Sequence, residues 1–353
     1  MRPFEIRDDL RELPPYRAPQ VDAPVRLNTN ESPYPPPERF FEELAARVRE
    51  LDLNRYPDRD ATALRRALGE RDGWPAEGVF AAHGSNEILQ TLFLTFGGPG
   101  RTLVTFEPTY SMYAQIARVT GTAHVQRELP EPWTLDEQTA AWGLSFEQPA
   151  ITMICSPNNP TGNAYPPAVV RAALEATQGL VVVDEAYIDF GATSARALLD
   201  ENERLVIVRS LSKSWRLAGA RLGYLLAHPW LVQAIQVARL PYHLSAMAQL
   251  VGEVALHHDA AMLRAVGEVV AERDRLAKEL ARVPGVEVFP SDANFILFRV
   301  PRDGATVWKE LAQAGVLVRD FSDRIPGALR VTVSTADENA AFVEALRSVL
   351  IDE

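Results

Sequence analysis

Cysteine, positive charge and long apolar runs are all scarce in this chain. Its 353 residues include one cysteine, Cys155, which excludes an internal disulfide and fits a reducing cytosol. The formal net charge is -11, which argues against the broad basic face that binds nucleic acid or an anionic membrane. An anionic small substrate would therefore have to be held by local arginines.

The scarcity of long apolar runs bears on localisation. No segment approaches the roughly 18 to 20 uninterrupted apolar residues that cross a bilayer. Residues 1–9 lack the apolar stretch of a secretory leader. We therefore expect a soluble, cytoplasmic protein. With 47% hydrophobic residues in 353, it can bury a large core, and two domains are the natural expectation.

Two motifs that would suggest other chemistry are incomplete. The glycine-rich segment 97–100 lacks the lysine of a nucleotide-binding P-loop. The pair His257-His258 lies in a polar helical stretch with no partner at metal-ligand spacing, so we expect a solvated helix face there. The sequence therefore predicts no metal site.

Proline is abundant in the first forty residues, and it breaks helices and removes backbone donors, so we expect an extended arm there. Helical periodicity follows at about 38–51 and 61–71. Strands then alternate with helices, which predicts a mostly parallel sheet covered on both faces. The strand-like apolar runs lie at 79–82, 102–106, 150–155, 180–183, 205–208 and 223–226.

The last third of the chain has a different pattern. A long helical stretch from about Pro229 to Arg282 leads to short strands at 286–288, 294–299, 316–319 and 329–333, and a closing helix begins near Asp337. This predicts a smaller α+β unit. We expect an N-terminal arm at 1–40, a large domain at 41–265, and a small domain at 266–353 that packs with the arm.

Lys213 is the most informative residue, because it follows an apolar strand and is flanked by hydroxyls in the segment 210–216. Asp184 ends another strand, and Asn159 lies in the loop 156–162 after a third. In parallel sheets, ligands bind beyond the carboxyl ends of the strands. An amine, a carboxylate and an amide are thus predicted to meet in one site.

These segments, together with 10–16, 27–33 and 55–58, resemble the class I/II aminotransferases of fold type I, which depend on pyridoxal 5'-phosphate (PLP). The resemblance extends from Asn30 to about Thr335. Within that family, the pattern is most similar to the histidinol-phosphate aminotransferases. The implied fold is an α/β large domain with a mostly parallel mixed sheet, plus a smaller α+β C-terminal domain.

The resemblance implies roles around the cofactor ring. Lys213 would bond covalently to PLP and then carry a proton during catalysis. Asp184 would face the pyridine nitrogen and keep the ring a good electron acceptor. Tyr187 and Asn159 would hydrogen-bond the 3-oxygen of the ring, and Tyr110 would stack on its face.

The resemblance also implies a phosphate-binding set. The N-terminus of a helix favours an anion, and an arginine can bond two phosphate oxygens. In the family, a tyrosine from the partner subunit reaches the same phosphate, which implies a homodimer with shared active sites. The residues concerned are Ser85, Asn86, Ser210, Ser212 and Arg221, with Tyr56 as the partner's contribution.

Substrate recognition would rest on two arginines and on the arm. Arg330 corresponds to the family's carboxylate-binding arginine, and in this group it would hold the substrate phosphate with help from Arg319. Tyr16 and Asn30 would close over the substrate, and Asn294 would orient the arginines. The implied reaction transfers an amino group from L-histidinol phosphate to 2-oxoglutarate, giving imidazole acetol phosphate and glutamate in histidine biosynthesis.

Other activities share these motifs. An aromatic amino-acid aminotransferase and a phosphothreonine decarboxylase of corrinoid synthesis would also use Lys213, Asp184 and Arg330. A non-catalytic PLP-binding regulator on the same fold is an alternative of a different class. The prediction of the substrate therefore depends on Arg319, Arg330 and Tyr16 more than on the cofactor motifs.

Overall fold

The computed structural model describes residues 6–11 and 21–351. Within this part of the chain, seven strands form one sheet in the order β2-β8-β7-β6-β5-β3-β4. All share one direction except β8, which pairs antiparallel with β2 and β7. The sheet is thus mostly parallel, as predicted. Its strands are β2 (Val79–Ala82), β3 (Thr102–Glu107), β4 (Ala123–Glu128), β5 (Ile151–Cys155), β6 (Leu180–Asp184), β7 (Leu205–Ser210) and β8 (Gly223–Ala227).

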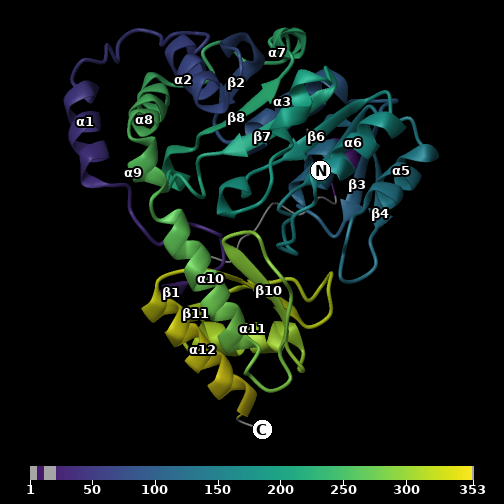
Figure 1. Cartoon of the computed structure of the whole chain (residues 1–353), viewed down its shortest axis with the longest axis vertical. Coiled ribbons are helices and arrows are strands. Elements are labelled where there is room, and N and C mark those ends of the chain that lie inside the picture. The colour runs from purple at the N-terminus through teal and green to yellow at the C-terminus, as the bar shows by residue number, and fades with distance from the viewer. Residues whose placement is uncertain (1–5, 12–20, 352–353) are drawn as a thin grey trace, which may run out of the picture.

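Helices cover both faces of this sheet (Figure 1). Alternate side chains of β7 explain why both faces need cover, because Leu205 and Ile207 enter one core cluster while Val206 and Val208 enter another. One face packs against α3 (Ser85–Phe96), α4 (Met112–Thr120) and α7 (Pro229–Ile235). The other packs against α1 (Glu38–Val48), α2 (Thr62–Asp72), α5 (Glu137–Ser145), α6 (Pro167–Ala176) and α8 (Ala246–His257).

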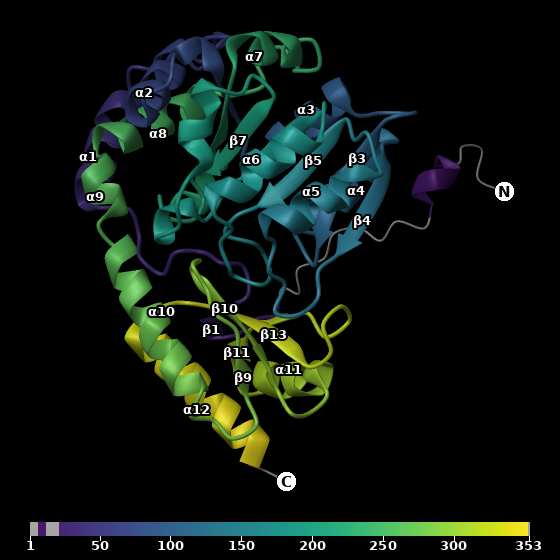
Figure 2. The same ribbon diagram turned by 45° about the vertical axis from the view of Figure 1, so that its right-hand side comes forward.

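The predicted long helical stretch from Pro229 to Arg282 is not one continuous helix. It consists of α7, α8, α9 (Asp259–Leu263) and α10 (Val266–Leu280). Pro241 lies in the gap after α7, where a proline disfavours helix. The side chain of Ser245 then caps α8 by accepting a hydrogen bond from the backbone N–H of Ala248 at 3.1 Å. Only α10 runs down to the C-terminal unit (Figure 2).

The C-terminal unit holds a four-stranded antiparallel sheet in the order β12-β13-β10-β9 within the described residues. Two helices pack with α10 around its core. The predicted strand at 329–333 begins one residue earlier, so Arg330 lies in its middle. The elements are β9 (Glu287–Val288), β10 (Phe295–Arg299), α11 (Gly304–Gln313), β11 (Val316–Leu317), β12 (Arg319–Asp320), β13 (Ala328–Thr332) and α12 (Ala336–Ile351).

The described part of the N-terminal segment is mostly extended and joins the C-terminal unit. Its strand β1 (Val25–Arg26) pairs parallel with β11, and Leu27 is buried in the core of that unit. Two helical pieces interrupt the predicted arm, since the chain turns at Asp8–Leu10 and α1 begins at Glu38. Further short 3₁₀ helices lie at Ala76–Gly78, Ile188–Phe190, Ala195–Asp200 and Ala218–Ala220. Among residues 6–11 and 21–351, no helix combines the length and the apolar character needed to cross a membrane.

Candidate active site

One pocket lies at the carboxyl ends of β5, β6 and β7, where the chain also meets the N-terminal segment and the C-terminal unit. It brings together residues that are far apart in the sequence. Of the predicted site residues, it is lined by Asn30, Ser85, Asn86, Tyr110, Asn159, Asp184, Tyr187, Ser210, Ser212, Lys213, Arg221, Arg319 and Arg330.

Lys213 reaches into this pocket from the loop after β7. Its Nζ donates a hydrogen bond to the backbone carbonyl of Thr29 at 2.9 Å. Burial, together with the positive charges of Arg330 and Arg221, lowers the pKa of this ammonium to about 8. A substantial fraction of the amine is therefore neutral near physiological pH, and only the neutral amine is a nucleophile or a base.

Asp184 is the last residue of β6, and its carboxylate is almost fully buried. One oxygen accepts a hydrogen bond from the Tyr113 hydroxyl at 2.8 Å, and the other accepts from the backbone N–H of Ala186 at 3.1 Å. Burial raises the pKa of this carboxyl, while both hydrogen bonds act in the opposite direction. A buried carboxylate that lines a pocket suits a ligand with a cationic N–H, such as a protonated pyridine.

A cradle for an anion lies at the start of α3. Gly84 precedes the helix with φ +80°, and a Cβ there would lie 2.9 Å from the guanidinium of Arg221. Gly223 faces the same turn, where a Cβ would lie 2.6 Å from the backbone nitrogen of Ser85. Arg221 also donates to the Ser212 hydroxyl at 3.3 Å. Backbone N–H groups, hydroxyls and a guanidinium thus converge as a phosphate requires.

Arg319 and Arg330 lie directly opposite each other on β12 and β13. Like charges in this cross-strand position repel each other, yet both side chains line the same pocket. Arg330 donates to the Asn159 side chain at 2.5 Å and to the Asn28 carbonyl at 3.0 Å. Its guanidinium also stacks over Phe321, 5.2 Å from the ring centre. A multiply charged anion between the arginines would relieve their repulsion.

The two residues predicted at the cofactor's 3-oxygen have other partners in this structure. Asn159 accepts from Arg330, and Tyr187 accepts from the Asn30 side-chain amide at 2.9 Å. Both nevertheless line the pocket. Asn294 donates to the Asn30 carbonyl at 3.1 Å, so it anchors the arm residue. Asn30 itself has φ +55°, a left-handed conformation that asparagine tolerates better than most residues.

Tyr110 completes the wall of the pocket beside the anion cradle. Its hydroxyl donates to the Asn86 side chain at 3.4 Å, and its ring meets Tyr113 edge-on at 5.5 Å. Tyr56 lies apart from this pocket: it is 80% exposed and stacks on Tyr242 at 4.4 Å. Tyr16 falls outside the described residues.

Several residues of the site could not be predicted from the sequence. Tyr113, which holds Asp184, lies inside an amphipathic helix and gave no motif signal. Phe321 and Thr29 also line the pocket, but only long-range contacts place them there. Cys155 is buried and also lines the pocket, and burial raises the pKa of its thiol well above the ordinary value.

Comparison with known proteins agrees with this geometry. The family model "Aminotransferase class I and II" matches residues 23–346. A histidinol-phosphate aminotransferase from Streptomyces avermitilis is 49% identical, over 98% of this chain and 96% of that protein. The one from Frankia casuarinae is 47% identical, over 98% and 90%.

Solved structures share the fold at low identity. The histidinol-phosphate aminotransferase from Sinorhizobium meliloti, in complex with pyridoxal-5'-phosphate, matches with a TM-score of 0.85 at 21% identity, over 93% of this chain and 91% of that chain. The L-threonine-O-3-phosphate decarboxylase from Porphyromonas gingivalis matches with a TM-score of 0.80 at 22%, over 92% and 99%. The predicted fold class, fold type I, is confirmed. The chain therefore belongs to the aminotransferase class I and II family.

Proposed function

We propose that this protein is a PLP-dependent aminotransferase that transfers the amino group of L-histidinol phosphate to 2-oxoglutarate. The products are imidazole acetol phosphate and glutamate, in histidine biosynthesis. The observation that carries this proposal is the pairing of Arg319 with Arg330 in the same pocket as the buried amine of Lys213. Relatives named histidinol-phosphate aminotransferase, at 43–49% identity over nearly the whole chain, support it.

The residues of the pocket fit PLP at both ends. Asp184 would hold the ring nitrogen, and the cradle at Ser85 and Arg221 would hold the phosphate. Tyr110 would lie against the ring, with Asn159 and Tyr187 near its oxygen. The chemistry that PLP supplies when bound is an aldehyde carbon that accepts the amino group and a ring that withdraws electrons.

The work of proton transfer falls to Lys213. A pKa of about 8 leaves part of this amine neutral, so it can take the proton from the substrate's reacting carbon. The resulting ammonium can return the proton to a neighbouring carbon without a further base. Thr29 positions Nζ through its carbonyl, so the N-terminal segment helps to orient the catalytic amine.

Arg319 and Arg330 would bind the substrate phosphate, which carries up to two negative charges. Guanidinium groups bond oxyanions bidentately, and the same pair can bind a carboxylate of glutamate or 2-oxoglutarate. Phe321 limits the orientation of Arg330 through its ring face. Neutral substrates would gain nothing from the second arginine.

The test is a comparison of amino donors with 2-oxoglutarate as the acceptor. We expect a kcat/KM for L-histidinol phosphate that exceeds the value for L-phenylalanine by a factor of at least about ten. With O-phospho-L-threonine, we expect amino transfer at most and no release of CO₂. A preference for phenylalanine, or decarboxylation of phosphothreonine, would assign the protein to one of the alternative activities.

We also propose the arrangement of the chain around this site. The arm at 1–40, the large domain at 41–265 and the small domain at 266–353 would assemble as a homodimer with shared active sites in the cytoplasm. The high exposure of Tyr56 and of its neighbour Leu53, together with Val237 and Leu240, supports an interface there. The buried free thiol of Cys155 is compatible with a reducing compartment.

A further inference from the structure

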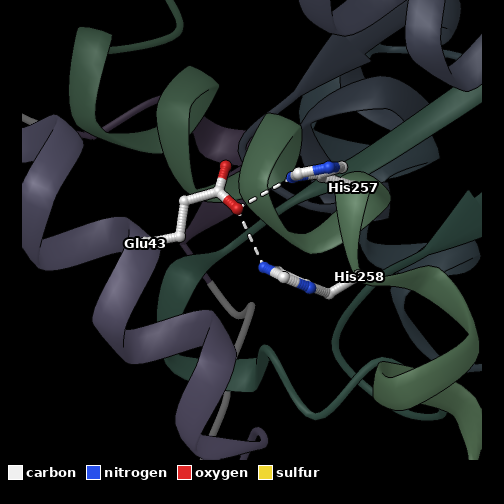
Figure 3. Close-up of side chains that lie close together, drawn as sticks. All are labelled: Glu43, His257 and His258. Atoms are coloured by element: carbon white, nitrogen blue, oxygen red, sulfur yellow. Dashed lines mark hydrogen bonds and ion pairs between the residues drawn. The ribbon is translucent and has the colours of Figure 1, made fainter.

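A second cluster of potential ligands lies between α1 and the junction of α8 with α9. Glu43 belongs to α1, His257 ends α8, and His258 follows it. The carboxylate oxygen Oε2 of Glu43 is hydrogen-bonded to Nδ1 of His257 at 2.8 Å and to Nε2 of His258 at 2.9 Å (Figure 3). The prediction of a solvated helix face is therefore confirmed for His257, whose side chain is 70% exposed, and wrong for His258, whose side chain is only 19% exposed.

The cluster has the composition of a metal site. Its two imidazole nitrogens and one carboxylate oxygen all lie within 4.8 Å of one another. Two histidines and a glutamate form a ligand set that binds Zn²⁺ with solvent in the open position. In such a set, imidazole ligands favour Zn²⁺ and its d-block neighbours over Mg²⁺ or Ca²⁺.

The surroundings of Glu43 orient its carboxylate for this purpose. Its other oxygen, Oε1, faces the guanidinium of Arg47 at 3.6 Å. Arg47 is in turn held by Glu253 at 2.8 Å. This chain of contacts leaves Oε2 directed at both imidazoles. Groups that fix a ligand from behind in this way raise the affinity of metal sites.

We propose that Glu43, His257 and His258 bind one divalent d-block cation of the zinc class. The ion replaces the two hydrogen bonds and takes solvent ligands on the exposed side of His257. With metal–nitrogen and metal–oxygen bonds of about 2.0–2.2 Å, donor atoms around one tetrahedral ion lie about 3.4 Å apart. Binding therefore requires Oε2 to move away from each imidazole nitrogen by about half an ångström, and the two imidazole nitrogens, which lie within 4.8 Å of each other, to come to a similar spacing by side-chain rotation.

The effect of this ion is structural. It fastens α1 to the end of α8, close to the point where the chain turns into α9 and α10 (Figures 1 and 2). Within the described part of the chain, none of the three ligands is among the residues that line the catalytic pocket. The ion therefore stabilises the packing of these helices and takes no part in amino transfer.

The test uses the full-length, PLP-loaded enzyme after treatment with a chelator. Titration with Co²⁺, followed by its visible absorption, and with Zn²⁺, followed by calorimetry, should show one equivalent per chain. Saturating Zn²⁺ should raise Tm by several degrees, because a ligand of the native state stabilises it. The single variants Glu43→Gln, His257→Gln and His258→Gln should each weaken binding by at least about tenfold.

The matched control is His228→Gln. His228 is also a surface histidine beside a glutamate, with its Nε2 3.7 Å from Glu203, but it has no second histidine. This variant should bind the ion like the parent, and all four variants should retain amino-transfer activity. Absence of saturable binding would overturn the proposal. So would equal affinity in the three ligand variants, because the ion would then lie elsewhere. Neither result depends on the identity of the amino donor.

Discussion

The surroundings of Lys213 set the pKa of its side chain, and this pKa determines the pH range in which the amine is neutral and can react. Burial and the neighbouring arginines lower the pKa of its ammonium to about 8. Below that pH the amine is mostly protonated, and protonation removes its nucleophilicity. Capture of added PLP by the stripped protein should therefore accelerate as the pH rises and level off above about 8.

This prediction can be measured by following the absorption of PLP after rapid mixing with apoprotein. The rate should vary in proportion to the neutral fraction of the amine. Lys213→Ala supplies the control, since borohydride should then fix no cofactor to the chain. A capture rate that stays constant between about pH 6 and 9 would show that the pKa of the Lys213 ammonium is not lowered as its burial requires.

Tyr113 is not among the residues that line the pocket, but it supports catalysis through its hydrogen bond to Asp184. In Tyr113→Phe the Asp184 carboxylate loses the hydroxyl group that donates a hydrogen bond to it at 2.8 Å. The pKa of Asp184, already raised by burial, should then rise further. The loss should cost about 1–3 kcal/mol of unfolding free energy and move the acidic limb of the pH–rate profile to higher pH.

Tyr165→Phe is a suitable control for Tyr113→Phe. Tyr165 is also buried, and its hydroxyl donates to the Trp133 carbonyl at 3.3 Å, away from Asp184. Its loss should lower stability and leave the pH profile in place. The same shift of the acidic limb in both variants would mean that Tyr113 acts on the fold in general and not on the carboxylate.

At the scale of elements, the antiparallel pairing of β12 with β13 sets the spacing of the two arginines. Arg319→Gln removes one of two charges facing the substrate phosphate. Because a hydrogen bond to a charged group contributes about 1.5–3 kcal/mol, KM for histidinol phosphate should rise by roughly tenfold or more. The kcat should change little, since Lys213 and Asp184 are untouched. Steady-state kinetics with both substrates will measure this.

Arg324→Gln provides the matched control on the loop that joins the same two strands. Arg324 is exposed and is not among the residues that line the pocket. It should leave both constants unchanged. If Arg319→Gln lowered kcat without raising KM, Arg319 would act on the reaction and not on recognition of the phosphate.

The elements that could be predicted from the sequence are those with a strong local signal. The buried strands β5, β6 and β7 are short apolar runs, and their common edge places Asn159, Asp184 and Lys213 together. β4 was missed because it is a largely polar edge strand. Contacts between distant segments, such as Tyr113 with Asp184 or Glu43 with the histidine pair, have no local signal at all.

At the scale of the whole molecule, the site depends on three parts of the chain. Thr29 and Asn28 belong to the N-terminal segment, yet their carbonyls accept hydrogen bonds from Lys213 and Arg330. β1 ties that segment to the C-terminal unit through β11. Movement of the C-terminal unit relative to the large sheet would therefore shift both the Thr29 carbonyl that Lys213 contacts and the substrate-binding Arg330.

The proposed sharing of active sites between subunits can be tested by complementation. If Tyr56 reaches the cofactor phosphate of the partner subunit, Tyr56→Ala and Lys213→Ala should each be nearly inactive as homodimers. A mixed dimer would contain one site with both residues intact. Random reassembly of equal amounts should then restore about one quarter of the parent activity, since half the dimers are mixed and each has one competent site. Activity is measured after mild denaturation and refolding of the mixture, with each variant refolded alone as the control. If Tyr56 serves its own subunit instead, each mixed dimer carries a defect in both sites, and no activity returns.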